Sequence, residues 1–361
     1  MFTFAGKLHI NNFSCIMANV IKIKKGLDIN LKGKASDVLL NGGKSESYAI
    51  VPDYYNGILP KVVAKVGEKV KAGSVLMIDK NRPEIKFVSP VSGEVTAVNR
   101  GEKRKVLSIV VKPDAQIEYE EFGKKNVASL QGAEVKEVLL NAGMWPFIKQ
   151  RPYDIVAAPL DTPRDIFVSA FYSAPLAPNF DFIVKGQEAD FQTGLNALAK
   201  LTNGKVYVGV RSGSVVSGMK GVEIVEVEGP HPAANVGVQI NHIKPVNKSE
   251  VVWVVNPADV IVIGRLFNKG VADFSRLVVL TGSETTERGY IKTISGCTIN
   301  SLVSGKIMEG KEDLRIISGN VLTGTKVRKD DYLGAYDNQI TVIPEGDKTY
   351  DFFGWATPGF G

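Results

Sequence analysis

The chain has 361 residues, of which 44% are hydrophobic and 23% charged, a composition typical of a globular protein with two or three domains. No stretch approaches the roughly 18 consecutive apolar residues that span a bilayer, so we expect no transmembrane helix. Its two cysteines, Cys15 and Cys297, are too few for a disulfide framework, a four-thiolate cluster or a structural zinc site.

The net charge of +6 is unevenly distributed along the chain. Residues 1–112 carry 19 Lys and Arg against 9 Asp and Glu, whereas the remainder is slightly acidic. Such a basic region can face nucleic acid, an anionic membrane surface or an acidic protein partner, or it can be a solvated surface without a partner. No nucleic-acid-binding motif accompanies the charge, so we expect no nucleic-acid partner.

We expect residues 1–19 to form an N-terminal extension. The first 16 residues lack the basic segment and apolar core of a signal peptide. Met17, followed by Ala-Asn-Val-Ile-Lys, resembles a natural start. The stretch before it is therefore either native or additional sequence.

Residues 20–112 are predicted to form an all-β domain. Short valine-rich runs at 61–66, 74–78 and 94–98 are separated by glycine turns, a spacing typical of a small sandwich or barrel. Residues 66–76 and 89–95 together resemble a lipoyl- or biotinyl-type barrel-sandwich hybrid domain. The glycines suit tight turns, and the alternating valines suit the core of a small sandwich.

A carrier domain of that type holds its modified lysine at a hairpin tip, at a set distance before the Ser-Pro-Val segment. Here that position is Arg82, and Lys80 lies two residues out of register. Because a guanidinium cannot form the lipoamide or biotinamide bond, we expect the fold without the carrier chemistry. A lipoyl or biotinyl carrier stays an alternative, which an adduct on Lys80 would favour.

The next stretch, 113–145, is predicted as a linker with one helix at 129–142. Val135, Val138 and Leu139 share one face of this helix, and Gly143 is placed to end it.

Residues 146–281 are predicted to form a Rossmann-like, doubly wound α/β domain, because strands and helices alternate. A helix is expected at 190–201, and Asn256 and Pro257 are suited to cap and begin a second one. The expected strands lie at 166–171, 205–210, 222–227, 251–255 and 277–280.

Residues 282–345 return to short β runs at 315–317 and 339–343, with a candidate helix within 299–308. They are predicted to form a small α+β domain. Residues 346–361 then begin a further C-terminal region.

The loop 229–237 follows a strand and precedes a helix, where a dinucleotide-binding loop would hold a pyrophosphate. Pro230 and Pro232 remove two backbone N–H donors, and the glycines miss the G-x-G-x-x-G spacing. We favour a rigid loop that shapes a contact surface. An independent NAD- or flavin-dependent oxidoreductase stays an alternative.

Residues for metal binding or catalysis are not evident. The chain has three histidines without metal-ligand spacing, and it lacks a Gly-x-Ser-x-Gly elbow and a Walker sequence. We therefore predict no catalytic, metal-binding or cofactor-binding residue.

Two segments, 53–60 and 145–153, combine aromatic residues with proline and charge. Planar ligands such as quinones stack on aromatic rings, and a phenol or guanidinium can donate to a quinone carbonyl. The alternative is that these aromatics fill a core or an interface between domains. The candidate quinone-proximal or subunit-contact residues are Tyr54, Tyr55, Phe147, Arg151 and Tyr153.

Several longer segments resemble one family, the NqrA subunits of the Na+-translocating NADH:quinone oxidoreductases (Na+-NQR), in the family's order and over about residues 17–361. These segments are 21–28, 100–104, 174–178, 185–191, 229–233 and 315–319. The resemblance implies a multidomain α/β and α+β protein: a barrel-sandwich hybrid domain, a Rossmann-like domain and a soluble-ligand-binding (SLBB-like) β-grasp domain. It also implies that the chain is truncated at its C-terminus.

The resemblance further implies a peripheral protein on the cytoplasmic face of the bacterial inner membrane, within a larger complex. The complex is a translocase that reduces ubiquinone or menaquinone with NADH and exports Na+. Its flavins and iron–sulfur centres belong to other subunits, so this chain is expected to hold no redox cofactor and not to be catalytic alone. It would dock on the membrane subunits, chiefly the membrane-embedded NqrB, near the quinone end.

Overall fold

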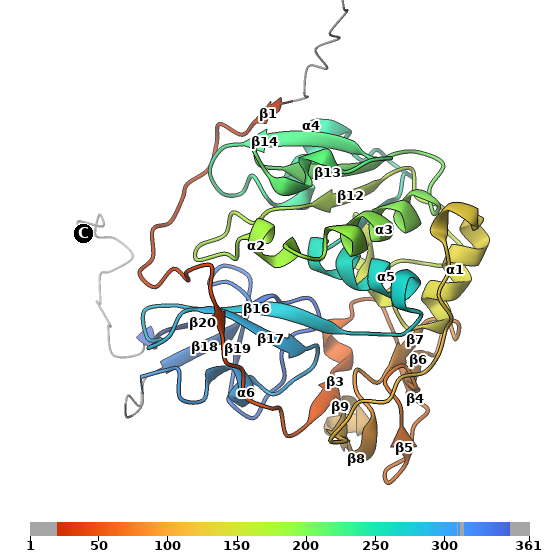
Figure 1. Cartoon of the computed structure of the whole chain (residues 1–361), viewed down its shortest axis with the longest axis vertical. Helices are drawn as coiled ribbons and strands as arrows, with labels where there is room; N and C mark the ends of the chain where they lie inside the picture. Colours follow the sequence, from red (N-terminus) through yellow and green to blue (C-terminus); the bar gives the residue numbers. More distant parts are fainter. Residues whose placement is uncertain (1–19, 309, 311–313, 347–361) are drawn as a thin grey trace, which may run out of the picture.

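The computed structural model describes residues 20–308, 310 and 314–346, and the predicted extension at 1–19 lies outside them, as does all but Gly346 of the predicted C-terminal region. The described chain forms three parts in contact, with the α/β part at the top of Figure 1, the C-terminal part at lower left and the β-rich first part at lower right. Among the described residues, no helix is both long and apolar enough to span a membrane.

The first domain consists of two small antiparallel sheets facing each other, as predicted for a barrel-sandwich hybrid. Its core contains Leu76, Met77, Val91 and Val95, all fully buried. One sheet has the order β3 (Tyr48–Ile50), β9 (Val106–Pro113), β8 (Gly93–Arg100), β5 (Lys69–Val70), and the other β4 (Pro60–Val62), β6 (Val75–Asp79), β7 (Lys86–Val88).

The predicted linker helix is confirmed as α1 (Gly132–Asn141). Val135 and Leu139 are fully buried on its inner face. Glu134 accepts a hydrogen bond from the Gln131 N–H, which caps the first turn. Gly143 follows the helix with a φ of 66°, a conformation that glycine adopts readily.

The second domain is built on a seven-stranded sheet, parallel except for an antiparallel hairpin at one edge. Its strands are, in spatial order, β1 (Val20–Lys22), β14 (Glu223–Glu228), β13 (Val206–Val210), β12 (Ile166–Ser169), β15 (Val252–Val255), β10 (Ile148–Arg151) and β11 (Ile155–Val156). The strand order reverses between β12 and β15, which makes this a doubly wound sheet as predicted.

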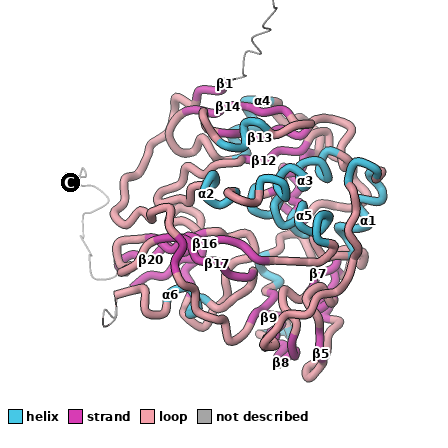
Figure 2. The backbone as a smooth tube through the Cα atoms, viewed as in Figure 1, coloured by secondary structure: helices cyan, strands magenta, loops and turns pink. Residues whose placement is uncertain are grey.

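Helices cover both faces of this sheet. The helices α2 (Phe180–Val184), α3 (Glu188–Ala199) and α5 (Pro257–Lys269) lie together on the near side in Figure 2. On the other face, α4 (Val236–Ile243) packs through Ile240 against Phe167, Val252 and Val254. As predicted, Pro257 is the first residue of α5 and the Asn256 side chain accepts from the Ala258 N–H.

The third domain contains a six-stranded mixed sheet and the short helix α6 (Ile299–Val303), where a helix was expected. Its strands are, in spatial order, β19 (Thr325–Val327), β18 (Leu314–Ser318), β20 (Gln339–Pro344), β16 (Ser275–Thr281), β17 (Gly289–Ile294) and β2 (Leu39–Leu40). The prediction that 277–280 is the last strand of the α/β sheet is wrong, because β16 pairs with β17 and β20. An apolar run predicts a buried strand, but it does not encode which sheet that strand joins.

The start of the predicted first domain also differs from the structure. Residues 20–47, here called the N-terminal strap, run across the other two domains (red in Figure 1). β1 pairs with β14 of the α/β sheet, and β2 pairs with β17 of the third domain. Both pairings are too distant in sequence for local periodicity to predict them.

Candidate functional site

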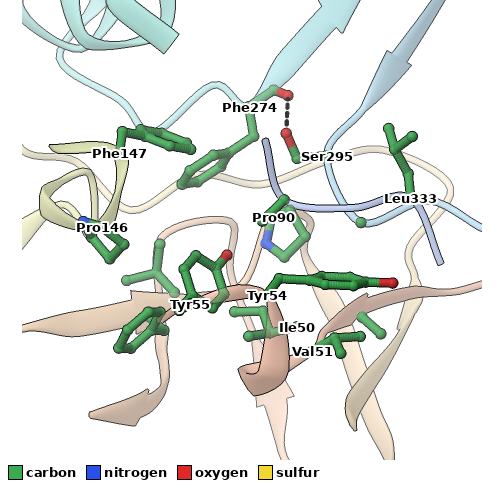
Figure 3. Close-up of a pocket in the computed structure, with 16 residues that line it drawn as sticks. Ile50, Val51, Tyr54, Tyr55, Pro90, Pro146, Phe147, Phe274, Ser295 and Leu333 are labelled. Atoms are coloured by element: carbon green, nitrogen blue, oxygen red, sulfur yellow. Dashed lines mark hydrogen bonds between the residues drawn. The ribbon is translucent and has the colours of Figure 1, made fainter. Parts of the chain in front are cut away.

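Aromatic residues from different domains meet where the three parts touch, in the region drawn in Figure 3. The Tyr55 ring lies 4.7 Å from Phe87 and 5.8 Å from Tyr336, and the Phe147 and Phe274 centroids are 6.1 Å apart. A cavity lined by Tyr55, Phe87, Phe147 and Phe274, here called the junction pocket, is only about 40 Å³ in volume. It has room for water but not for a quinone ring, since ligand pockets measure roughly 300–1,000 Å³.

The tyrosines of the junction are held by the surrounding protein. The Tyr54 hydroxyl donates to the Tyr332 carbonyl at 3.0 Å, and the Tyr336 hydroxyl donates to the Pro146 carbonyl at 2.7 Å. Burial raises the pKa of Tyr54 to about 12, and burial likewise raises the pKa of Tyr55. Both phenols are therefore neutral at physiological pH.

Arg151 and Tyr153 lie apart from the junction, at the end of the β10–β11 hairpin. Tyr153 is 79% exposed. Asp154 forms ion pairs with two residues of β10 and so fixes the end of the hairpin. Its Oδ2 lies 2.6 Å from Lys149 Nζ, and its Oδ1 lies 3.3 Å from Arg151 Nη2. The structure thus brings Tyr54, Tyr55 and Phe147 to one pocket and leaves Tyr153 pointing into solvent.

Phe147 also lines a second, larger cavity, and Arg151 of the β10–β11 hairpin lines the same cavity. This cavity has a volume of about 620 Å³ and is here called the α4 groove. It lies over β10 and β15 beside the start of α4, and it reaches the carboxyl ends of β12 and β15 at Ser169 and Asn256. Parallel sheets bind ligands at such a switch point in strand order. Lys149, Arg151, Asp154 and Tyr336 contribute to its walls.

The loop 229–237 contacts the strap. The His231 N–H donates to Asp28 Oδ1 at 2.9 Å, and the Ala234 N–H donates to Ser173 Oγ at 3.0 Å. Gly229 has a φ of 120°, and a Cβ there would lie 2.2 Å from the Ile23 carbonyl oxygen. Together with Pro230 and Pro232, these bonds leave no free backbone donor at residues 230–234, where a pyrophosphate would need several.

Arg82, at the position of a carrier lysine, joins two domains. Its Nε lies 2.8 Å from Asp79 Oδ2, while Nη1 and Nη2 donate to the carbonyls of Val156 and Gly57 at 3.1 and 2.9 Å. Lys80 is exposed beside it.

Sequence reasoning missed several residues of the site. Lys149 shares a strand face with Arg151 through the two-residue period of β10, a signal that was available. Tyr336 and Phe274 gave no local signal, since they come from distant parts of the chain. Among the described residues, no group of His, Cys, Asp or Glu is placed to hold a metal ion.

The three domains match three family models in chain order. These are the NqrA N-terminal barrel-sandwich hybrid domain (residues 21–114), the NqrA second alpha/beta domain (residues 130–272) and the NQRA C-terminal domain (residues 277–329). The chain is 37% identical over 344 residues to the NqrA subunit of the Na(+)-translocating NADH-quinone reductase of Neisseria meningitidis serogroup A, a match covering 94% of this chain and 76% of the relative. The corresponding protein of Hahella chejuensis is 38% identical over 346 residues, with the same coverage.

The chain belongs to the NqrA family. This confirms the family expected from the sequence segments. Within the NqrA domain matches, Tyr54 and Tyr55 fall in the first domain and Phe147, Arg151 and Tyr153 in the second. Phe274 lies between the second and third matches, so the junction pocket joins parts of the NqrA fold that no single domain match contains.

Among solved structures, the chain resembles an NAD+-reducing NiFe-hydrogenase in its H2-reduced state, with a TM-score of 0.35 and 11% identity. The match covers 50% of this chain and 41% of the hydrogenase chain.

Proposed function

We propose that this chain serves as the NqrA subunit of a Na+-translocating NADH:quinone reductase. It is a peripheral protein on the cytoplasmic face and docks on the membrane subunits, chiefly the membrane-embedded NqrB, near the quinone end. The complex reduces ubiquinone or menaquinone with NADH and exports Na+. Membership of the NqrA family and the names of the curated relatives support this proposal.

In this proposal, the chain holds no redox cofactor, and NADH, flavins and iron–sulfur centres act in other subunits. The loop 229–237 supports it, because the N–H groups of residues 231 and 233–235 are bonded to Asp28, Ser173 or the loop itself, and positions 230 and 232 are proline. Cys297 also supports it, since this thiol is fully buried and burial raises its pKa, which disfavours the thiolate that metals require.

The observation that carries the docking proposal is the exposed Tyr153 on a hairpin held by ion pairs. Tyrosine and arginine are enriched at the centres of protein interfaces, and a preformed hairpin loses little conformational entropy on binding. Tyr153 and Arg151 are therefore assigned the contact itself. Tyr54, Tyr55 and Phe147 hold the hairpin in place from behind, because Phe147 directly precedes β10 and its ring lines the junction pocket with the two tyrosines.

The test is co-purification of the assembled complex from membranes that carry Tyr153→Ala in the full-length protein. We expect the yield of assembled complex to fall about tenfold, as for an interface residue of the strongest class. Tyr153→Phe keeps the ring and should assemble normally, and Val66→Ala, at a 62% exposed position of the first domain, is the matched control.

A second measurement addresses the quinone end. A photoreactive quinone analogue, bound to the intact complex, should label the peptide that contains residues 145–156. Normal assembly of Tyr153→Ala together with labelling confined to other peptides would contradict the proposed placement.

A further inference from the structure

The α4 groove is a built cavity that shares Phe147 and Arg151 with the residues of the proposed docking role. Its floor is the face of the sheet on which Lys149, Arg151 and Val254 project, and the start of α4 and Tyr336 also line it. We propose that it binds a small organic anion, a planar ring that carries one carboxylate or phosphate group. This site goes beyond the proposed function and does not depend on it.

The size and walls of the groove fit such a ligand. A volume of about 620 Å³ lies within the range of cavities that enclose small molecules, roughly 300–1,000 Å³. Phe147, Phe171, Tyr172 and Tyr336 line it, so a planar ring meets aromatic surface. The residues come from two domains, which is a common place for ligand sites.

The charged side chains of the groove favour a ligand with one negative charge. Lys149 and Arg151 are opposed by the single carboxylate of Asp154. Lys149 is already engaged, with its Nζ 2.6 Å from Asp154 and 4.9 Å from the centre of the Tyr336 ring. Arg151 is not satisfied: its Nε is buried and has no hydrogen-bond partner among the described residues. A buried guanidinium N–H without an acceptor is rare unless a ligand or water supplies one.

The first turn of α4 faces the same cavity. Within the described part of the chain, no acceptor is found for the N–H groups of Val236 and Gly237, and the Asn235 side chain does not cap the helix. Free N–H groups at a helix start attract an anion. A Cβ at Gly237 would meet no atom within 4 Å, so the approach to these groups is open.

These features select a single anion over a dinucleotide. The N–H groups of residues 230–235 are bonded within the protein or replaced by proline, which leaves donors for one anionic group and not for a pyrophosphate. Asp154 would repel a second negative charge in the same groove.

The test is calorimetric titration of the purified chain with 2-naphthoate and with its neutral counterpart, 2-naphthamide. We expect the carboxylate to bind about tenfold more tightly than the amide, because only the carboxylate forms charge-assisted bonds with Arg151. Arg151→Gln should remove this preference. Arg100→Gln, at an exposed arginine of the first domain, should leave it unchanged.

A second variant fills the groove without removing a charge. Gly237→Leu should abolish binding of both probes, whereas Gly218→Leu, at a glycine with equally open surroundings and outside the groove, should bind as the wild type does. Equal binding of naphthoate and naphthamide, an unchanged preference in Arg151→Gln, or no binding to the wild type would overturn the inference. A short-chain quinone that binds as tightly as naphthoate would also overturn it, while leaving the docking role intact.

Discussion

Arg276 and Asp259 form an ion pair in the interior, with Nη2 2.9 Å from Oδ1 and side chains only 2% and 0% exposed. Asp259 belongs to the first turn of α5 and Arg276 to β16, so the pair joins the α/β domain to the third domain. Burial raises the pKa of Asp259 to about 6, and Arg276 only partly offsets this. The second oxygen, Oδ2, has no hydrogen-bond partner among the described residues.

The raised pKa of Asp259 makes the stability of the fold depend on pH in a defined direction. An aspartate in the unfolded chain has a pKa of about 3.9, so the folded state binds this proton more tightly. The contribution of Asp259 is therefore fully present below about pH 4 and is lost as the pH rises through about 6.

We expect Arg276→Met to destabilise the chain strongly at neutral pH and less in mild acid. The change leaves a buried carboxylate without its partner, which typically costs about 3–5 kcal/mol of unfolding free energy. At pH 5, Asp259 can take up a proton in the folded state, so the loss should be smaller than at pH 8. Urea denaturation at pH 5 and at pH 8 measures the loss of unfolding free energy in Arg276→Met at each pH.

The double variant Asp259→Leu and Arg276→Met is the control for this pair. Replacing a whole buried ion pair by apolar side chains is often close to neutral, so the double variant should recover most of the loss. Equal losses for Arg276→Met at pH 5 and pH 8 would show that Asp259 is not the group that responds.

Asp273 should make the stability of the fold depend on pH in the direction opposite to that of Asp259. Burial alone would raise its pKa, but Arg265, Ser275 and Lys269 together lower it to about 2. Its stabilisation is therefore present above about pH 4 and is lost as the pH falls through about 2. Asp273→Asn should lower the unfolding free energy by about 1–2 kcal/mol at pH 7, after allowance for solvent screening. The difference in unfolding free energy between Asp273→Asn and the wild type should become smaller in acid, and urea denaturation from pH 7 to pH 2.5 measures this. Asp330→Asn, at an exposed carboxylate, should show no such narrowing.

The local patterns of the sequence predicted most of the individual elements. The caps at Asn256 and Pro257 predicted the start of α5, and the valine alternation predicted the sandwich of the first domain. Both depend on neighbours within a few residues. By contrast, β1 and β16 each carry a strand pattern that fits any sheet, and their actual partners are set by tertiary packing.

The candidate site was predictable only in part for the same reason. The period of β10 places Lys149 and Arg151 on one face, so their common groove could be anticipated. Tyr55 was named as a candidate from the sequence, but its surroundings could not be predicted. Its ring contact Tyr336 comes from the far end of the described chain. The small junction pocket is lined by residues of all three domains, among them Phe274 and Leu333, and no sequence spacing reveals that they meet.

The strap depends on a close backbone approach at Gly33. A Cβ there would lie 2.1 Å from the Gly282 carbonyl carbon, and φ is 99°. The Gly33 carbonyl also accepts from the Gly282 N–H at 2.9 Å and from Thr281 Oγ1 at 2.6 Å. Gly33→Ala should therefore release this part of the strap, which would appear as faster trypsin cleavage after Lys34 and faster hydrogen exchange at the Gly282 amide.

Gly67→Ala separates the backbone penalty of a positive φ from the steric clash that a Cβ would cause at Gly33. Gly67 has a similar φ of 87°, but a Cβ there would meet nothing within 4 Å. This variant should show only the backbone penalty of about 1 kcal/mol, with unchanged cleavage at Lys34. Equal behaviour of the two variants would mean that the strap does not depend on the contact with Gly282.

Arg82→Lys should weaken the attachment of the first domain to the α/β domain although the charge is kept. The guanidinium of Arg82 bonds Asp79, Gly57 and Val156 at once, and a single ammonium cannot reproduce this fork. Asp79 is 1% exposed and would lose part of its pairing, so we expect a loss of about 2–4 kcal/mol in unfolding free energy. Arg100→Lys is the matched control, since Arg100 is exposed and its guanidinium donates to the Arg104 carbonyl within the first domain. If both variants unfold at the same urea concentration as the wild type, Arg82 does not hold the domains together. If Arg82→Lys alone is destabilised, the position that holds the modified lysine in carrier domains serves here as a structural clamp.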